Sequence, residues 1–384
     1  MNNKIPTLLS YAFRPFFLLN AIFAIFVVLA WTMTLHGSGL PGLAPLWHGH
    51  EMLVGFAMAT VAGFSLTAVS VWTGRPALNG QPLAWLVVCW LAGRLAMALS
   101  GWLPLRLVIS LDMLFPLLLC MLLGREIVAA GNRRNYVLVA VTALLAVLNA
   151  LYHLGVGQVI PNAERVAVYL LIHLILLLVT LIAGRIVPSF TGNWLRMHGS
   201  KREPVSTFPV DVSVVVLTIV VGLAATFMPT HPVTGVLAFA TALAHGFRLS
   251  RWRGLATKSN PLLFVLHATY AWLPVGYALV GCSIFGWLIS PTAALHALTM
   301  GAIGSMVLAV TTRVSLGHTG RPLQATRATV AAYWIMMIGI LIRVLGPLTG
   351  MDYLLIIDLS AAAWTLAFAL FVWIYWPILT RPHP

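Results

Sequence analysis

The chain has 384 residues, of which 60% are hydrophobic and only 8% are charged, and its formal net charge is +14. Soluble domains carry about a quarter charged residues, so this composition excludes a water-soluble protein. The basic residues fall between apolar runs rather than in one patch or stripe, which argues against binding to nucleic acid.

Long apolar runs bounded by charge, Pro or Gly follow one another along the whole chain. A hydrocarbon core of about 30 Å needs roughly 20 apolar residues per helix, so the runs predict an all-α polytopic membrane protein of about twelve transmembrane helices. The first run lacks the small-residue cleavage site of a signal peptide and is expected to be a retained span. The expected spans are 15–36, 47–70, 82–100, 104–124, 134–154, 163–187, 209–229, 232–250, 261–281, 291–313, 326–346 and 353–377.

The basic residues orient these spans. With both termini cytoplasmic, all but four of the 22 Lys and Arg residues lie on or toward the inside, and the exceptions are Arg94, Arg106, Arg165 and Arg343. Lys and Arg in short loops resist translocation. We therefore expect a multi-pass protein of the bacterial inner (cytoplasmic) membrane, with the lipid bilayer as its surroundings. No loop is long enough for a separate fold, so residues 1–384 are expected to form a single membrane domain.

An internal repeat links the second and tenth spans. The stretch from His50 to Pro76 aligns without a gap on the stretch from His296 to Pro322, and both begin with His and end in Thr-Gly-Arg-Pro. His173 on the sixth span lies 123 residues from each of the two histidines. The spacing predicts three four-helix units, 1–130, 131–255 and 256–384, around a pseudo-threefold axis.

Ionisable residues inside spans are costly and generally face a bundle interior or a cavity, so each is a candidate for function. At about 1.5 Å per residue, His48, His50, Glu51 and His296 lie within roughly 10 Å of the outer ends of their helices, and His173 lies about 15 Å in. A simpler interpretation of His48 and His50 is that they cap a helix start and meet lipid headgroups. The recurrence of a histidine on three equivalent spans favours ligation.

Neutral imidazole is a common ligand of copper and haem iron. His50 and His296 lie at one depth and could clamp a haem from both sides, while His48 and His173 are the next pair, for copper or a second haem. His267 lies seven residues into the ninth span from the inside. Three interpretations of His267 stay open: a ligand on the inner half, a partner across a helix interface, or a satisfied core histidine.

Charged residues toward the outer ends of spans have two interpretations. Arg94 and Arg343 could bind haem propionates, or they could pair with Asp112 and Asp358, because buried charges are usually paired. Glu51, Asp112 and Asp358 are also candidates for carrying protons, on their depth alone.

Two stretches at the inner face are punctuated by Gly and Pro and are expected to be loops: 184–194 (GRIVPSFTGNW) and 311–322 (TTRVSLGHTGRP). They could turn the chain and cap helix ends, or bind a headgroup or a quinone. Cys89, Cys120 and Cys282 fit no Cys-x-x-Cys spacing and are expected to be packed thiols rather than ligands or disulfides.

Several of these stretches together resemble the NnrS family, membrane proteins of nitric-oxide metabolism that contain haem and copper. The resemblance rests on Arg14-Pro15-Phe16-Phe17, Trp47-His48-Gly49-His50-Glu51, Gly184-Arg185 through Thr191 with Asn193-Trp194, His267 with Ala271-Trp272-Leu273-Pro274, and the run from His296 to Arg321. It covers almost the whole chain. It implies one or two haem b groups, copper, and an association with denitrification and resistance to nitrosative stress.

The architecture also resembles the catalytic subunits of haem-copper oxidases and nitric-oxide reductases, which have twelve spans in three arcs and metal-binding histidines on the second, sixth, seventh and tenth. Histidines on the second, sixth and tenth spans recur here. The seventh span holds none, and only His231 follows at its outer end. This departure puts a three-histidine copper site of that type in doubt.

Together with the resemblance, these observations predict a redox-active inner-membrane protein that binds haem and copper and either acts on nitric oxide or responds to it in nitrosative-stress defence. Turnover as an oxidoreductase would need an electron donor, for which a quinol is the candidate. The rival interpretation is a transporter or export factor for a metal or an iron-nitrosyl species, with the same histidines as a transient site. Transporters more often show inverted repeats and broken helices near the midplane. The repeat here is parallel and favours a fixed cofactor scaffold.

Overall fold

The computed structural model describes residues 5–43 and 45–382, and every regular element in these residues is helical. Twelve helical stretches are long and apolar enough to cross a membrane. The spans contain α1 (Phe13–Leu35), α2 (Pro45–His50) with η2 (Glu51–Ala57) and α3 (Met58–Thr73), α4 (Gly80–Ala98), α5 (Leu105–Ala129), η3 (Arg133–Asn135) with α6 (Tyr136–Val156), α7 (Ala163–Met197), α8 (Phe208–Phe227), α9 (Pro232–Ser250), α10 (Pro261–Tyr270) with α11 (Trp272–Ile284), α12 (Pro291–His296) with η5 (Ala297–Gly304) and α13 (Ser305–His318), α14 (Arg327–Leu345) with η6 (Gly346–Leu348), and α15 (Tyr353–Thr380). The predicted all-α membrane fold with twelve spans is confirmed.

The first predicted loop is wrong, and the second is wrong except at its end, where residues 319–322 lie outside any helix. The stretches 184–194 and 311–318 continue helices α7 and α13, which end at Met197 and His318. Periodic burial explains the extension of α7, because Val187, Thr191 and Leu195 are all buried and follow one another at a spacing of four residues. This stripe outweighs Pro188, which removes one helix hydrogen bond but does not end the helix.

The ninth span is interrupted where the sequence predicts one helix. α10 ends at Tyr270 and α11 begins at Trp272, with Ala271 between them. Pro274 has no backbone N–H, so the carbonyl of Tyr270 loses its intrahelical partner at this point. The interruption lies about 14 Å along the span from Pro261, at 1.5 Å per residue.

Both copies of the repeat contain a π-helical segment at the same place. His50 is followed directly by the π-helical segment Glu51–Ala57, and His296 by the π-helical segment Ala297–Gly304. The two spans that contain these segments are also the most buried of the twelve. In each of them, 78% of an apolar stretch of 18 residues is buried. π-helical segments are rare and frequently mark functional sites. The structure thus supports the twofold repeat by a feature that the residue alignment alone does not contain.

The described helices divide into two compact units. The first comprises the residues up to Leu171, Val314–Arg321 and the residues from Phe371 onward, and the second comprises Ile172–Arg313 and Pro322–Leu370. The first copy of the repeat lies wholly in the first unit, and the second copy lies in the second unit from His296 to Arg313. The expected division into units 1–130, 131–255 and 256–384 is not confirmed and stays a prediction.

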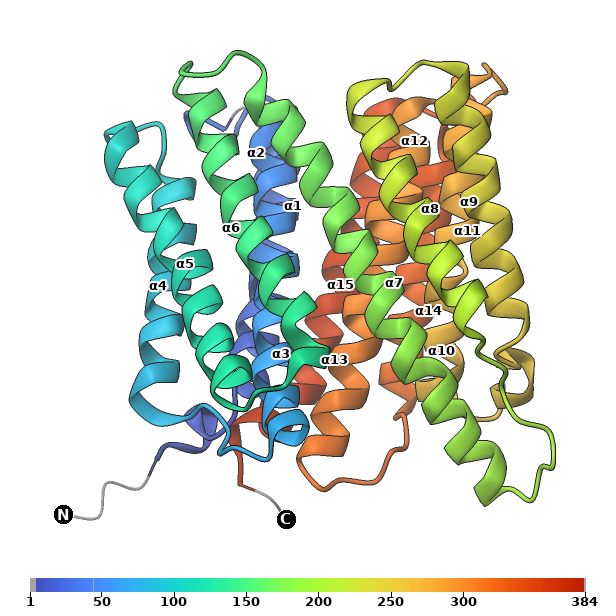
Figure 1. Ribbon diagram of the computed structural model, residues 1–384. Coiled ribbons are helices and arrows are strands. Elements are labelled where there is room, and N and C mark those ends of the chain that lie inside the picture. The colour runs from blue at the N-terminus through green and yellow to red at the C-terminus, as the bar shows by residue number, and fades with distance from the viewer. Residues whose placement is uncertain (1–4, 44, 383–384) are drawn as a thin grey trace. The chain divides into compact units, whose positions relative to one another are not determined.

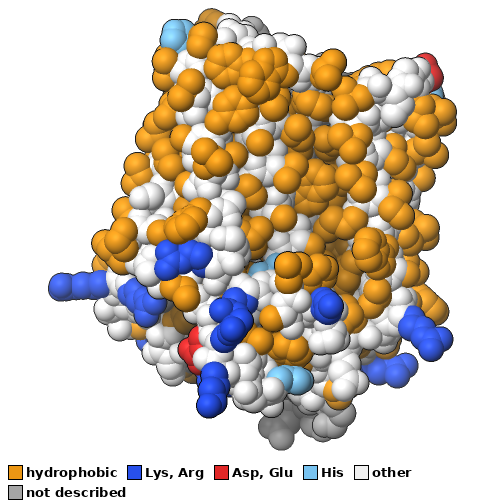
Figure 2. All heavy atoms as spheres, turned by 90° about the vertical axis from the view of Figure 1, so that its right-hand side faces the viewer, with side chains coloured by type: hydrophobic (Ala, Val, Ile, Leu, Met, Phe, Trp, Pro, Cys, Tyr) orange, Lys and Arg blue, Asp and Glu red, His pale blue; other side chains and the backbone are white. Residues whose placement is uncertain are grey.

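Within each unit, neighbouring helices pack along their length. In the first unit α5 lies between α4 and α6, and α1 packs on α3 (Figure 1). In the second unit α9 lies between α8 and α11, and α11 contacts α12 and η5. Figure 2 shows hydrophobic side chains over most of one face, with Lys and Arg side chains gathered at one end of it. This distribution is the one expected of a helix bundle in lipid.

Candidate metal centre

Three buried side chains of the first unit form a cluster with the composition of a metal site. His50 is the last residue of α2, Asp112 lies on α5 and His153 lies on α6. One ligand atom from each lies within 4.8 Å of the other two. All three side chains are almost completely shielded from solvent. No other such group of His, Cys, Asp and Glu occurs in residues 5–43 and 45–382.

Asp112 is the centre of this cluster. Its Oδ2 accepts a hydrogen bond from His153 Nε2 at 2.8 Å and lies 3.4 Å from His50 Nε2. Asn149, one turn before His153 on α6, donates from Nδ2 to the same Oδ2 at 2.8 Å. The Asn149 carbonyl oxygen in turn accepts from His50 Nε2 at 2.7 Å. The amide therefore orients the aspartate and the histidine at the same time.

Arg94 and Glu51 complete the cluster. The Arg94 guanidinium donates to Glu51 Oε1 and to Asp112 Oδ1, and Glu51 Oε1 also accepts from His50 Nδ1 at 2.9 Å. The structure thus shows the pairing of Arg94 with Asp112 that the sequence offered as an alternative to propionate binding. The second carboxylate oxygen of Glu51, Oε2, is buried and has no hydrogen-bond partner within the described part of the chain.

The charges of the cluster call for one further positive charge. Glu51 and Asp112 are 0% exposed and Arg94 is 4% exposed, so two carboxylates share one guanidinium out of contact with water. An uncompensated buried charge costs several kcal/mol. Both ring nitrogens of His50 face oxygen acceptors, and both can donate together only when the ring carries a second proton. A bound metal cation would supply the same positive charge in place of that proton.

The π-helical segment η2 shapes this site. The Gly55 carbonyl, which lies in η2, accepts a hydrogen bond from the Trp90 indole at 2.9 Å. A Cβ at Gly55 would lie 2.4 Å from the Phe23 ring and 3.0 Å from an Arg94 guanidinium nitrogen. Glycine is therefore required here, because it lets Arg94 approach the backbone and reach Glu51 and Asp112.

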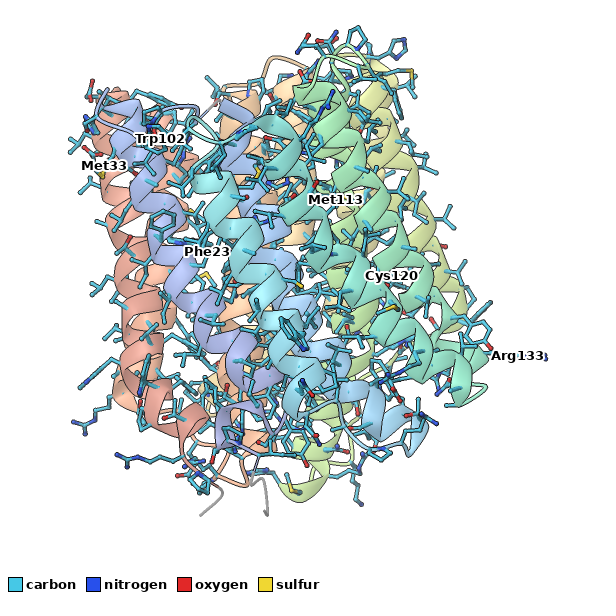
Figure 3. All side chains as sticks on the ribbon, turned by 90° about the vertical axis from the view of Figure 1, so that its left-hand side faces the viewer. Phe23, Met33, Trp102, Met113, Cys120 and Arg133 are labelled. Atoms are coloured by element: carbon cyan, nitrogen blue, oxygen red, sulfur yellow. The ribbon has the colours of Figure 1, made fainter. Side chains whose placement is uncertain are left out.

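His48 does not join the cluster. Its ring stacks on Trp31, with ring centroids 5.4 Å apart and planes tilted by 16°. Residues two apart on a helix point in different directions, so His48 faces Trp31 while His50 faces the cluster. Met113 is the neighbour of Asp112 on α5 and accepts from Asn149 Nδ2 at 3.4 Å. Figure 3 shows Met113 toward the end of α5 that is remote from Arg133.

The remaining predicted histidines lie in the second unit. His173 on α7 is buried, packs against Gly222 of α8, and has no hydrogen-bond partner for Nδ1 within the described residues. It belongs to a different unit from His48, and His296 belongs to a different unit from His50. Both predicted ligand pairs therefore stay predictions.

His267 has a partner across a helix interface. The Thr191 hydroxyl donates to the Val187 carbonyl at 2.8 Å, so it accepts from His267 Nε2–H at 2.9 Å. The other ring nitrogen, Nδ1, is buried beside Gly254 and has no partner in the described chain. Of the three interpretations left open by the sequence, the helix-to-helix contact is the one that the structure displays.

A backbone hydrogen bond fixes the ring of His296. Its Nδ1 donates to the Thr292 carbonyl at 2.8 Å, and this bond fixes the tautomer in which Nε2 carries the free lone pair. Arg343 on α14 donates to the Tyr353 hydroxyl at 3.5 Å, and Asp358 is half-buried on α15. Propionate binding by Arg343 and its pairing with Asp358 both stay predictions.

A second buried network was missed by sequence reasoning. His245 on α9 donates from Nε2 to Thr218 at 3.0 Å and accepts from the Tyr270 hydroxyl at 2.9 Å. Arg248 donates to Tyr270 at 3.2 Å and to the Asp211 carboxylate at 2.7 Å. The available signal was the spacing of His245 and Arg248, which lie three apart on one helix face inside a predicted span. Both ring nitrogens of His245 have hydrogen-bond partners, which is typical of a network that stabilises helix packing.

The three cysteines are free and half-buried, as the sequence predicted.

No curated protein matches the chain. The model of the NnrS protein family matches residues 7–383. The match covers nearly the whole chain, including every residue of the cluster around Asp112, and with the twelve spans it shows that this protein belongs to the NnrS family of membrane proteins linked to nitric-oxide metabolism.

Proposed function

We propose that this protein binds haem and a transition metal in the bacterial inner membrane and acts there as an oxidoreductase on nitric oxide. The observation that carries the proposal is the buried cluster of His50, Asp112 and His153, which has the composition and spacing of a metal site. Apolar nitric oxide can enter such a site through the bilayer, so a centre between helices needs no water-filled channel for it.

The cluster fits a metal by its donor set. Two imidazoles and one carboxylate can together bind a divalent first-row ion and leave coordination positions open. Arg94 donates to the other carboxylate oxygen of Asp112, and Glu51 accepts from Nδ1 of His50, as the outer partners of metal ligands commonly do. The bound metal would supply redox chemistry, while Glu51 and the ring of His50 hold protons beside it.

The second unit fits a haem ligand at His296. An axial histidine needs one ring nitrogen fixed by a hydrogen bond and the other free for iron. The bond from His296 Nδ1 to Thr292 provides the first, and Nε2 makes no hydrogen bond within the described residues. His173 and His267 each keep one buried ring nitrogen without a partner and are further haem or copper ligands in this proposal. Arg343, a buried cation on α14, would hold a propionate.

The experiment that tests the proposal is an optical spectrum of the purified protein, oxidised and reduced, together with metal analysis. We expect a haem Soret band and at least one further metal ion per chain. His296→Ala should abolish the band or change the iron spin state. His231→Ala is the matched control, because His231 lies in the same unit but is exposed and only caps α9. A protein without a Soret band would refute haem binding.

One structural observation favours the rival function, a transporter or export factor for a metal or an iron-nitrosyl species. The ninth span is interrupted at Ala271, and broken helices recur in transporters. Anaerobic consumption of nitric oxide with a quinol donor separates the two functions. Consumption that depends on the quinol supports the oxidoreductase, whereas metal movement into vesicles without consumption supports the transporter.

A further inference from the structure

We propose that the cluster of His50, Asp112 and His153 binds ferrous iron rather than copper, and that nitric oxide binds this iron at an open position. The inference rests on the proposed function in one respect, namely that the cluster holds a metal. It adds the identity of that metal and the ligand that the site takes.

The donor atoms favour iron. Two histidines and one carboxylate that leave neighbouring positions open are the ligand set of non-haem ferrous sites. Copper in a reduced membrane protein is cuprous, and cuprous copper prefers thiolate and thioether sulfur. The cluster contains no cysteine among its ligand atoms. Its hardest donor, Asp112, is also the one that touches both histidines.

The distances fit a divalent first-row ion. Such an ion lies about 2.1 Å from nitrogen and oxygen donors, which holds neighbouring donors roughly 3.0–3.4 Å apart. The Asp112 Oδ2 lies 3.4 Å from His50 Nε2 and 2.8 Å from His153 Nε2. Small side-chain rotations therefore suffice to admit the ion. Metal binding releases the protons that His50 Nε2 and His153 Nε2 donate, and the hydrogen bond of His50 to Asn149 opens so that His50 Nε2 can face the ion.

A second observation points to a ligand at the same place. Glu51 is fully buried, and its Oε2 has no hydrogen-bond partner within the described residues. A buried carboxylate oxygen without a partner is costly. An additional hard oxygen donor beside the cluster favours iron over cuprous copper, and two carboxylates against one guanidinium accommodate a divalent charge.

Met113 supplies the means to separate iron from copper. Its thioether sulfur lies next to the cluster, at 3.4 Å from Asn149 Nδ2. A cuprous site at this place would draw on that sulfur, since the three cysteines are not among the clustered ligands. A ferrous site would not. Met113→Leu keeps the volume of the side chain and removes only the sulfur donor.

The experiment compares the full-length protein with three test variants and one control variant, all purified anaerobically from cells supplied with both metals. Total iron, haem iron and copper are measured per chain, and non-haem iron is the difference between the first two. The samples are then exposed to nitric oxide and recorded by EPR, in which a high-spin ferrous nitrosyl is distinct from haem nitrosyl. The test variants are Asp112→Asn, His153→Gln and Met113→Leu.

We expect Asp112→Asn and His153→Gln each to lower non-haem iron by at least about tenfold and to remove the high-spin nitrosyl signal, with haem content unchanged. Met113→Leu should leave both readouts at the wild-type level. The two ligand variants lie on different helices, so the experiment stands if one of them fails to fold. Asp352→Asn, at an exposed helix start, is the control for loss of a carboxylate.

Loss of copper instead of iron from the ligand variants, or loss of metal from Met113→Leu, would overturn the inference and leave the proposed metal centre in place. Unchanged iron and copper in both ligand variants would refute the metal centre itself. The two failures are therefore distinguishable.

Discussion

Replacement of Arg94 by methionine tests the electrostatic account of the cluster most directly. Within the described residues, Glu51 and Asp112 pair with three basic side chains, namely the Arg94 guanidinium and the two histidines of the cluster. Arg94→Met keeps a long side chain in the same space but removes the charge and the hydrogen bonds. Two fully buried carboxylates would then face each other with no guanidinium between them.

The expected cost follows from burial. Removing one partner of a buried ion pair costs about 3–5 kcal/mol, because a charge is left without compensation. At about 1.4 kcal/mol per factor of ten, the unfolding equilibrium should shift by roughly 100- to 4000-fold. The pair of Arg196 with Glu203 is the control, since its side chains are 55% and 52% exposed. Arg196→Met should cost at most about 1 kcal/mol.

The assay is unfolding in mixed micelles with increasing denaturing detergent, followed by circular dichroism, in the presence of a chelator. The chelator is needed because a bound cation would replace part of the lost positive charge. The double variant Arg94→Met with Asp112→Asn should recover part of the loss, because it removes one of the two carboxylates. Equal costs for Arg94→Met and Arg196→Met, or no recovery in the double variant, would refute the reasoning.

Three further predictions concern stability. Gly184→Ala should lower the melting temperature, because its Cβ would lie 2.0 Å from an Arg248 guanidinium nitrogen. Arg14→Ala should raise hydrogen exchange at the end of α15, since Arg14 donates to backbone carbonyls there, two of them at 2.8 Å. Tyr270→Phe should cost about 1–3 kcal/mol of unfolding free energy, because it leaves His245 Nδ1 buried without its donor.

Each of these predictions has a matched control. Gly124→Ala should leave the melting temperature unchanged or slightly higher, since the nearest atom to its Cβ would lie at an ordinary 3.4 Å. Arg327→Ala removes an exposed arginine and should not alter exchange in α15. Tyr136→Phe removes a hydroxyl from a side chain that is 41% exposed and should cost little. A control that changes as much as its partner variant would contradict the contact assigned to that partner.

The candidate site was only partly predictable. His50, Glu51, Arg94 and Asp112 were each named from their polarity and depth, but as members of different pairs and roles. His153 and Asn149 were not assigned to a site. The contact of His50 with Asn149 joins residues 99 apart in the chain, and no local pattern encodes such a distance. The depth of a residue in the membrane restricts which residues can be its partners. The rotation of its helix about the helix axis then selects among these partners.

The membrane fold, the twelve spans and the twofold repeat could be predicted from the sequence, because apolar length and the placement of basic residues report directly on transfer into lipid. The tertiary structure alone decided where α7 and α13 end, where the two π-helical segments lie, and which charges meet. These features depend on packing between helices. Packing buries one face of a helix end that looks polar in sequence, and it brings a compensating charge to a buried carboxylate. The cluster around Asp112 exists because four separate elements, α2 with η2, α4, α5 and α6, present their few polar side chains to one another inside the first unit.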